Sequence, residues 1–192
     1  MRVSKISRTT KETQIDLELN LDGGDIDIST GVGFLDHMLT LFAHHGGMGL
    51  VIKATGDTHI DDHHTVEDIG ISLGKAIYEA LGDKKGIVRY GQMLLPMDET
   101  LIESVVDISG RSYLVFNAEF RSGKVGTFDT ALVEEFFVAF TSNAKITLHI
   151  NMRYGRNDHH IAEGIFKGVA RAMRVAMRVE SDSVNSTKGM IE

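Results

Sequence analysis

Hydrophobic and polar residues alternate along two short stretches near the start of the chain. Residues 14–19 and 25–28 both follow a period of two, which is typical of strands with one buried face. The Asp22-Gly23-Gly24 segment between them has the composition of a tight turn. We therefore expect these two strands to pair as a hairpin with one solvated face.

A helical spacing of apolar residues follows. It covers residues 34–42, which predicts a short helix, and residues 48–54 then have the pattern of a strand. The same helical spacing predicts a longer helix from Asp62 to Leu81. This helix should end near Gly82, because glycine readily adopts the left-handed conformation that closes a helix.

The second half of the chain repeats this order of elements. Residues 100–108 and 112–120 are strand-like on either side of a Ser109-Gly110-Arg111 turn, residues 132–140 have helical spacing, and residues 145–150 alternate before a second long helix. Each half is thus predicted to run strand, strand, helix, strand, helix.

These patterns predict an internally duplicated α+β fold. Neither half can bury both faces of its sheet alone, so we expect the helices of the two halves to pack against each other. The first half covers residues 1–85 and the second covers residues 86–180, with Gly86 to Pro96 as the connection and residues 181–192 as a polar C-terminal tail. The chain has 192 residues, of which 42% are hydrophobic, and this allows a sizeable core.

Charge and composition exclude several classes of partner. The net charge of −7 provides no general basic surface for a nucleic-acid backbone or an anionic membrane. Cysteine is absent, no apolar run approaches the roughly 20 residues of a membrane span, and no signal-peptide core follows the first residues. We therefore expect a soluble cytoplasmic protein, in which an anionic ligand would need a local basic cluster.

One five-residue motif occurs twice, each time at the predicted start of a long helix. The copies are His63-His64-Thr65-Val66-Glu67 and, 96 positions later, His159-His160-Ile161-Ala162-Glu163. The aspartates before them, Asp62 and Asp158, are suited to cap the helices by accepting hydrogen bonds from free backbone N–H groups. Surface histidines behind a capping aspartate would explain a single copy, whereas the duplication favours metal binding.

Helix geometry divides each motif between two directions. Residues four apart lie on one face, so His63 and Glu67 can share one metal ion, while the adjacent His64 diverges by about 100°. The second copy repeats this arrangement, and two ions are the simplest interpretation. Neutral imidazole together with carboxylate suits Mn, Fe, Co, Ni or Zn better than Ca or Mg.

Further candidates lie outside the two motifs. A shift of 98 positions aligns the apolar stripes of the two short helices and places His37 opposite Glu135, so that each could complete a ligand set; the alternative is that both are ordinary polar residues beside an apolar stripe. Residue types that bind phosphate occur at Arg89, at Arg111 and in the tail segment Ser186-Thr187-Lys188-Gly189.

Together these motifs resemble imidazoleglycerol-phosphate dehydratase of histidine biosynthesis, in its monofunctional form. The resemblance spans essentially the whole chain, and the order of its motifs is specific. The segments that carry it are Phe34-Leu35-Asp36-His37-Met38-Leu39, Thr55-Gly56-Asp57 with Asp61 to Asp68, Asp107-Ile108-Ser109-Gly110-Arg111, and His159 to Glu163.

The resemblance implies a fold, a cofactor and an assembly. The fold would be a ribosomal-S5-domain-2-like α+β fold with helices packed between two sheets. Two Mn²⁺ ions would occupy each active site, and 24 subunits in octahedral symmetry would form active sites between them. The implied metal ligands are His37, His63, His64, Glu67, His159, His160 and Glu163. The family usually has histidine where this chain has Glu135, so Glu135 would give one ion an extra carboxylate.

The implied reaction converts D-erythro-imidazole glycerol phosphate into imidazole acetol phosphate and water. Two ions that bind the substrate's imidazole would stabilise an imidazolate, which can lose the hydroxyl through a diazafulvene-like intermediate. Glu12 and Glu163 are the candidates for proton transfer. The implied contacts of this small phosphorylated imidazole substrate are Glu12, His37, His45, His63, Glu67, Arg89, Arg111, Ser186, Thr187 and Lys188.

Two other classes of protein are compatible with the motifs. A two-metal hydrolase would activate water against a phosphoester, but the motifs are rich in imidazole and poor in bridging aspartates. A metal-storage or structural metal protein would use the duplicated sites for assembly. Arg111 and the Ser-Thr-Lys tail favour an anionic small-molecule ligand over that second alternative.

Overall fold

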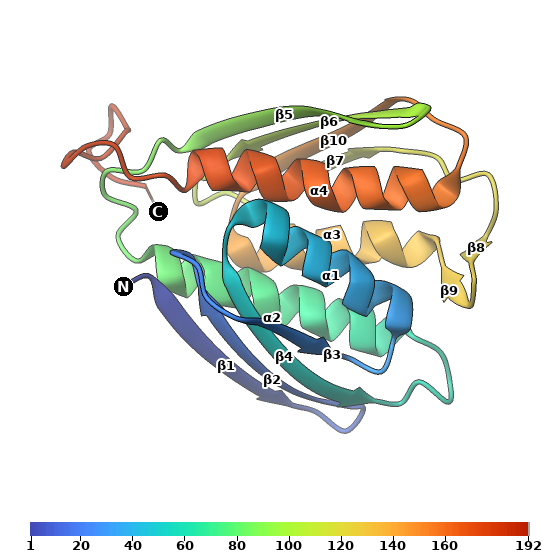
Figure 1. Cartoon of the computed structure of the whole chain (residues 1–192). Helices are drawn as coiled ribbons and strands as arrows, with labels where there is room; N and C mark the ends of the chain where they lie inside the picture. The colour runs from blue at the N-terminus through green and yellow to red at the C-terminus, as the bar shows by residue number, and fades with distance from the viewer. Residues whose placement is uncertain (192) are drawn as a thin grey trace.

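Two four-stranded sheets enclose a layer of helices in the computed structural model, which describes residues 1–191 (Figure 1). The strand order is β1-β2-β4-β3 in the first sheet and β5-β6-β10-β7 in the second, and β8 and β9 form a small ribbon. The first half contains β1 (Val3–Thr9), β2 (Thr13–Asn20), β3 (Ile26–Ser29), α1 (Gly33–Gly46), β4 (Gly49–Gly56) and α2 (His63–Leu81). The second half contains β5 (Tyr90–Met97), β6 (Thr100–Asp107), β7 (Tyr113–Asn117), β8 (Lys124–Val125), β9 (Phe128–Asp129), α3 (Ala131–Ala144), β10 (Thr147–Tyr154) and α4 (Asp158–Ala176).

The predicted hairpin near the start of the chain is wrong. β2 pairs antiparallel with β1 on one side and with β4 on the other, while β3 pairs parallel with β4 at the sheet edge. β1 was not predicted because it lacks an alternating pattern of apolar residues. Its inward positions include Ser4 and Arg8, which bond to Glu79 and Asp68 of α2 instead of packing as apolar groups. Each half therefore has three strands of its four-stranded sheet before its short helix, not two, and the second half adds the β8–β9 ribbon.

The segment Gly86 to Pro96 is likewise more than a connection. Most of it forms β5, an edge strand that pairs antiparallel with β6. Pro96 is tolerated there because an edge strand has one side without ladder hydrogen bonds. At Gly91 the backbone lies so close to Ala172 on α4 that a side chain would not fit, and this glycine weakened the alternating pattern.

The helices of the two halves pack across each other, as expected. α1 packs against α4, and α2 packs against α3. Gly70 and Gly74 permit a close approach of α2 and α3, because an added Cβ would lie 2.8 Å from the Phe136 oxygen and 2.5 Å from the Phe140 oxygen. Aromatic rings complete the core between helices, including Phe42 of α1 at 5.8 Å from Phe140 of α3. The two halves thus share one hydrophobic core.

This arrangement places both histidine motifs at one end of the molecule. α2 and α4 begin at the same end of the helix layer and run in the same direction, toward the chain termini at the opposite end (Figure 1). No helix among residues 1–191 is long and apolar enough to cross a membrane. The fold therefore leaves one end for the motif residues and the other for the C-terminal tail.

Candidate active site

The two long helices begin differently from the prediction. The side chain of Asp62 makes no capping hydrogen bond, and Asp61 accepts from the backbone N–H of His63 at 2.8 Å instead. In α4 the cap is Asn157, whose side-chain oxygen accepts from the N–H groups of His159 and His160 at 3.0 and 3.4 Å. The predicted capping role of both aspartates is therefore wrong.

Asp158 instead ties the start of α4 to a neighbouring loop. Its buried carboxylate accepts from the backbone N–H groups of Arg121 at 2.9 Å and Ser122 at 2.7 Å, and from the Ser122 hydroxyl. Burial alone would raise the pKa of Asp158, but these hydrogen bonds lower the pKa overall. The loop that leads from β7 to β8 is thereby fixed beside the second motif.

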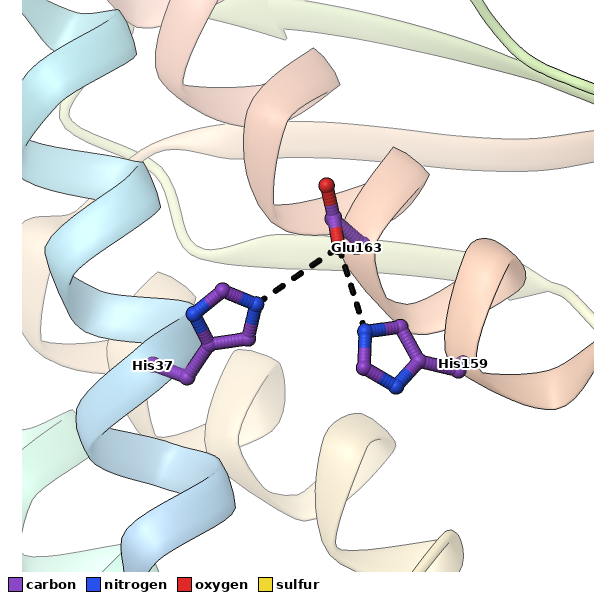
Figure 2. A group of neighbouring side chains, drawn as sticks. All are labelled: His37, His159 and Glu163. Atoms are coloured by element: carbon purple, nitrogen blue, oxygen red, sulfur yellow. Dashed lines mark hydrogen bonds and ion pairs between the residues drawn. The ribbon is translucent and has the colours of Figure 1, made fainter.

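Two histidines and a glutamate converge between α1 and α4 (Figure 2). Glu163 Oε2 lies 3.2 Å from His159 Nε2 and 3.6 Å from His37 Nε2, and the three ligand atoms lie within 4.8 Å of one another. A metal ion with bonds of about 2.1 Å would place adjacent ligand atoms about 3.0–3.4 Å apart. The spacing and the mixture of imidazole and carboxylate therefore fit a transition-metal ion.

Lys167 holds the other oxygen of the same carboxylate. Its ammonium group, one helical turn after Glu163 on α4, forms an ion pair with Glu163 Oε1. Burial would raise the pKa of Glu163, but the bond and charge of Lys167, together with His159 and His37, lower the pKa overall. Glu163 is thus kept ionised with Oε2 directed at the two imidazoles. The sequence motifs gave no signal for Lys167 beyond its position four residues after Glu163.

An aromatic wall supports the same cluster. The ring of Phe34, on α1, lies edge-on to the His159 ring at 5.3 Å and 5.0 Å from the ring of Phe128, which is buried in β9. Sequence reasoning identified Phe34 only as part of the apolar stripe of α1 and did not identify Phe128. The β8–β9 ribbon has no counterpart in the first half, so the duplication gave no signal for it.

The second histidine of each motif is bonded to a carboxylate. His64 Nδ1 lies 2.9 Å from Asp57 Oδ2, and His160 Nδ1 lies 2.8 Å from Glu99 Oε2. The bond to Asp57 raises the pKa of His64, and the bond from His160 lowers the pKa of Glu99 to about 2. Glu12 Oε1 lies 4.0 Å from His64 Nε2, at the tip between β1 and β2.

The first motif does not form a second cluster within one chain. Among the described residues, His37, His159 and Glu163 are the group of this kind that converges. His63 instead lines a cavity of about 590 Å³ together with Asp61, Asp62 and Lys124. Glu135 is half-buried on α3, and its side chain makes no hydrogen bond or ion pair with another described residue.

The predicted phosphate-binding residues surround one cavity of about 370 Å³. Its lining includes Arg89, Arg111, Ser186, Thr187 and Lys188. Arg89 is already engaged, because it donates to Asp107 at 2.8 Å and to the Asn185 oxygen at 2.9 Å, and Asp107 raises the pKa of Arg89. Arg111 is 64% exposed in its side chain, so an anion in this cavity would depend mainly on Arg111 and the tail.

The cavity and the cluster lie at opposite ends of α4. The backbone N–H of Arg89 donates to the Ala176 oxygen at the end of this helix, whereas His159 lies in its first turn. At a rise of 1.5 Å per residue, the two positions on α4 are about 25 Å apart. His45 lies between these ends, in the last turn of α1, where burial and the charges of Lys167 and Arg171 lower its pKa. A small molecule cannot span the full distance within one chain.

The duplicated two-sheet fold, with imidazole and carboxylate groups converging where two helices meet, defines the class as an α+β enzyme. The family model of imidazoleglycerol-phosphate dehydratase matches residues 30–173. Similar proteins of that description include those of Streptococcus mutans, 59% identical over 194 residues, and Methanosarcina mazei, 55% identical over 192 residues, both covering 100% of each chain.

Solved structures agree with these relatives. The crystal structure of imidazoleglycerol-phosphate dehydratase from Staphylococcus aureus is 50% identical with a TM-score of 0.86, covering 93% of this chain and 99% of that one. The Pyrococcus furiosus structure, in complex with (S)-C348, is 40% identical with a TM-score of 0.85, covering 96% and 99%. The chain belongs to the imidazoleglycerol-phosphate dehydratase family. It is therefore a hydro-lyase, and the family supports dehydration of imidazoleglycerol phosphate in histidine biosynthesis.

Proposed function

We propose that the chain dehydrates D-erythro-imidazole glycerol phosphate to imidazole acetol phosphate with two Mn²⁺ ions in each active site, and that His37, His159 and Glu163 bind one of them. The observation that carries this proposal is the convergence of two imidazole nitrogens and one buried carboxylate oxygen from two helices within 4.8 Å. Imidazole nitrogens favour transition metals, and a carboxylate oxygen suits manganese.

The reaction has a physical difficulty that the ions would remove. The proton to be abstracted lies on a carbon with no adjacent carbonyl, so a carboxylate alone would remove it very slowly. When bound, the two ions would stabilise the substrate's imidazole as an imidazolate, so that the neighbouring hydroxyl can leave through a diazafulvene-type intermediate.

Residues of this chain would move the protons and hold the phosphate. Glu12 is our candidate for proton transfer because its carboxylate is 53% exposed on a turn and lies within 4.0 Å of His64. Glu163, which Lys167 keeps ionised, is the second candidate. Arg111, Ser186, Thr187 and Lys188 would bind the phosphate in their common cavity, and Arg89 would fix the wall of that cavity through Asp107.

The active site is proposed to form between chains of a homo-oligomer, with 24 subunits as the assembly. Support comes from the distance of about 25 Å that α4 imposes between the cluster and the phosphate cavity. The other proposed ligands, which one chain leaves apart, would complete the coordination of the two ions across chains: His63, His64, Glu67, His160 and, in place of the histidine usual in the family, Glu135. A cytoplasmic location belongs to the same proposal, because the reaction serves amino-acid biosynthesis.

Metal removal tests the proposal directly. Turnover of imidazole glycerol phosphate should disappear on chelation and return with added Mn²⁺, while Glu163→Gln should lower turnover by at least about 10²-fold even with excess Mn²⁺. Glu134→Gln, at an exposed position of α3, is the matched control and should keep full turnover. Full activity after verified metal removal would contradict the proposal.

A further inference from the structure

The second histidine of each motif is held by a carboxylate at the same ring nitrogen. The acceptor is Asp57 for His64 and Glu99 for His160, and both bonds are made to Nδ1, at 2.9 and 2.8 Å. An ionised carboxylate only accepts hydrogen bonds, so each Nδ1 must carry the proton. In the neutral imidazole this leaves the lone pair on Nε2.

The two carboxylates come from unrelated places in the duplicated halves. Asp57 directly follows β4, whereas Glu99 lies in the turn between β5 and β6. The counterpart of that turn in the first half is the turn between β1 and β2, which carries Glu12 near Nε2 of His64, not near Nδ1. The duplication therefore did not simply copy this bond. The presence of such a bond in both halves indicates that a proton on Nδ1 has a role in both.

We propose that Asp57 and Glu99 are positioning residues that fix the Nδ1–H tautomer of His64 and His160 and reserve Nε2 of each ring for a metal ion. This inference rests on the proposed function, because it concerns how the chain prepares two ligands for Mn²⁺. The same Nε2 atom faces Glu163 in His37 and His159, so the assignment gives four of the five proposed histidine ligands the same ligating atom. Carboxylates that hold ligating histidines in this way raise metal affinity about 10–100-fold.

The second oxygen of each carboxylate has different surroundings in the two halves. Glu99 Oε1 accepts from the backbone N–H groups of Asn157 at 2.8 Å and Arg156 at 3.2 Å, so Glu99 attaches the His160 ring to the start of α4. Asp57 Oδ1 is buried and has no hydrogen-bond partner among the described residues. A glutamine at position 99 has one acceptor oxygen for two sets of donors, whereas an asparagine at position 57 can keep its oxygen on His64.

The variants Glu99→Gln and Asp57→Asn therefore separate the two cases. After chelation, Mn²⁺ affinity measured by equilibrium dialysis should fall about 10–100-fold in Glu99→Gln and by a smaller factor in Asp57→Asn. Spectra of ¹⁵N-histidine-labelled metal-free protein should show that His160 loses its Nδ1–H form in Glu99→Gln. Glu103→Gln is the control. Glu103 lies on β6, four residues after Glu99, but it accepts from Asn151 and pairs with Arg153 on β10 and bonds to no histidine among the described residues.

Four results would overturn this inference. Unchanged Mn²⁺ affinity in Glu99→Gln, or an equal loss in Glu103→Gln, would overturn the positioning role while leaving the metal site of the wild-type chain intact. An unchanged His160 tautomer in Glu99→Gln would also overturn it. If the wild-type chain itself bound no Mn²⁺, the proposed function would fail together with this inference. Thermal unfolding of each variant shows whether a loss of affinity is only a loss of fold.

Discussion

At the scale of single residues, Glu163 contacts both Lys167 on α4 and the two histidines of the candidate metal cluster. One carboxylate oxygen pairs with Lys167, and the other faces His37 and His159. The lysine compensates the charge of the buried carboxylate, so that Glu163 can stay ionised next to the two imidazoles. This division of one side chain between an ammonium group and two imidazoles prepares an anionic ligand before any ion binds.

The cavity proposed to bind phosphate offers a second set of single-residue interactions that can be tested separately. Arg111→Ala and Lys188→Ala should each raise KM, at a cost of about 1.5–3 kcal/mol, because a charged hydrogen bond to the substrate is lost. Bound metal, measured by elemental analysis, should stay unchanged. Arg153→Ala, which removes a surface arginine paired with Glu103, should leave KM as it is. A loss of metal with unchanged KM in the two cavity variants would remove the phosphate assignment.

At the scale of elements, the close approach of α2 and α3 depends on glycine. Gly74→Ala would place a Cβ 2.5 Å from the Phe140 oxygen and should destabilise the fold by about 1–3 kcal/mol through overpacking. Gly33→Ala at the start of α1 meets no atom within 4 Å and is the matched control. Denaturant unfolding should show a lower midpoint for the first variant only. Equal midpoints would mean that the two helices can move apart at little cost.

Arg2, near the chain start, donates a hydrogen bond to the end of α4 and forms an ion pair with Asp22 that has a defined pH dependence. Arg2 donates to Asp22 at 2.6 Å and to the Met177 oxygen, and the hydrogen bond from Arg2 is the main cause that lowers the pKa of Asp22. A lowered pKa in the folded state stabilises the fold above the unfolded value of 3.8, and this stabilisation is lost as pH falls through the folded value.

Asp22→Asn should therefore lower the free energy of unfolding by about 0.5 kcal/mol at pH 7, and the difference from wild type should shrink as pH falls below 3.8. The side chain of Asp22 is 47% exposed, which keeps the effect small. Thermal unfolding across this pH range measures it. Asp16→Asn, at an exposed position of β2, provides the comparison. A difference that grows toward acid pH would contradict the assignment.

Local patterns predicted the helices of this fold better than its strands. α1 to α4 were recognisable because their buried residues recur at helical spacing. β1 and β5 were missed because Ser4, Arg8 and Gly91 occupy inward positions, where contacts with α2 and α4 replace apolar packing. The position of β3 beside β4 depends on residues far apart in the sequence, and a local pattern does not contain that information.

The sequence likewise predicted some residues of the candidate site and missed others. The spacing within the second motif and the alignment of the short helices led to His37, His159 and Glu163, which the fold brings together. Asp57 and Glu99 were not recognised as partners of His64 and His160, because they approach from a loop and a turn. Capping was misassigned because aspartate and asparagine have similar preferences at helix starts, and only the fold selects Asn157.

At the scale of the whole molecule, one chain keeps the two parts of the proposed substrate site far apart. The candidate metal cluster lies at the start of α4, and the cavity proposed to bind phosphate lies beyond its end, about 25 Å away. Imidazole glycerol phosphate is too small to span that distance. It can contact metal ligands and phosphate-binding residues together only if a neighbouring chain supplies one of the two sets. Assembly and activity should therefore be inseparable in this protein.

Mixing two inactive variants tests this account most directly. One chain would carry Glu163→Gln and keep its phosphate cavity, and the other would carry Arg111→Ala with Lys188→Ala and keep its metal cluster. When the two are co-assembled, about one active site in four should combine two intact parts and regain turnover of imidazole glycerol phosphate, although each variant alone stays inactive. Turnover of the mixture no greater than the sum of the separate variants would contradict an active site shared between chains.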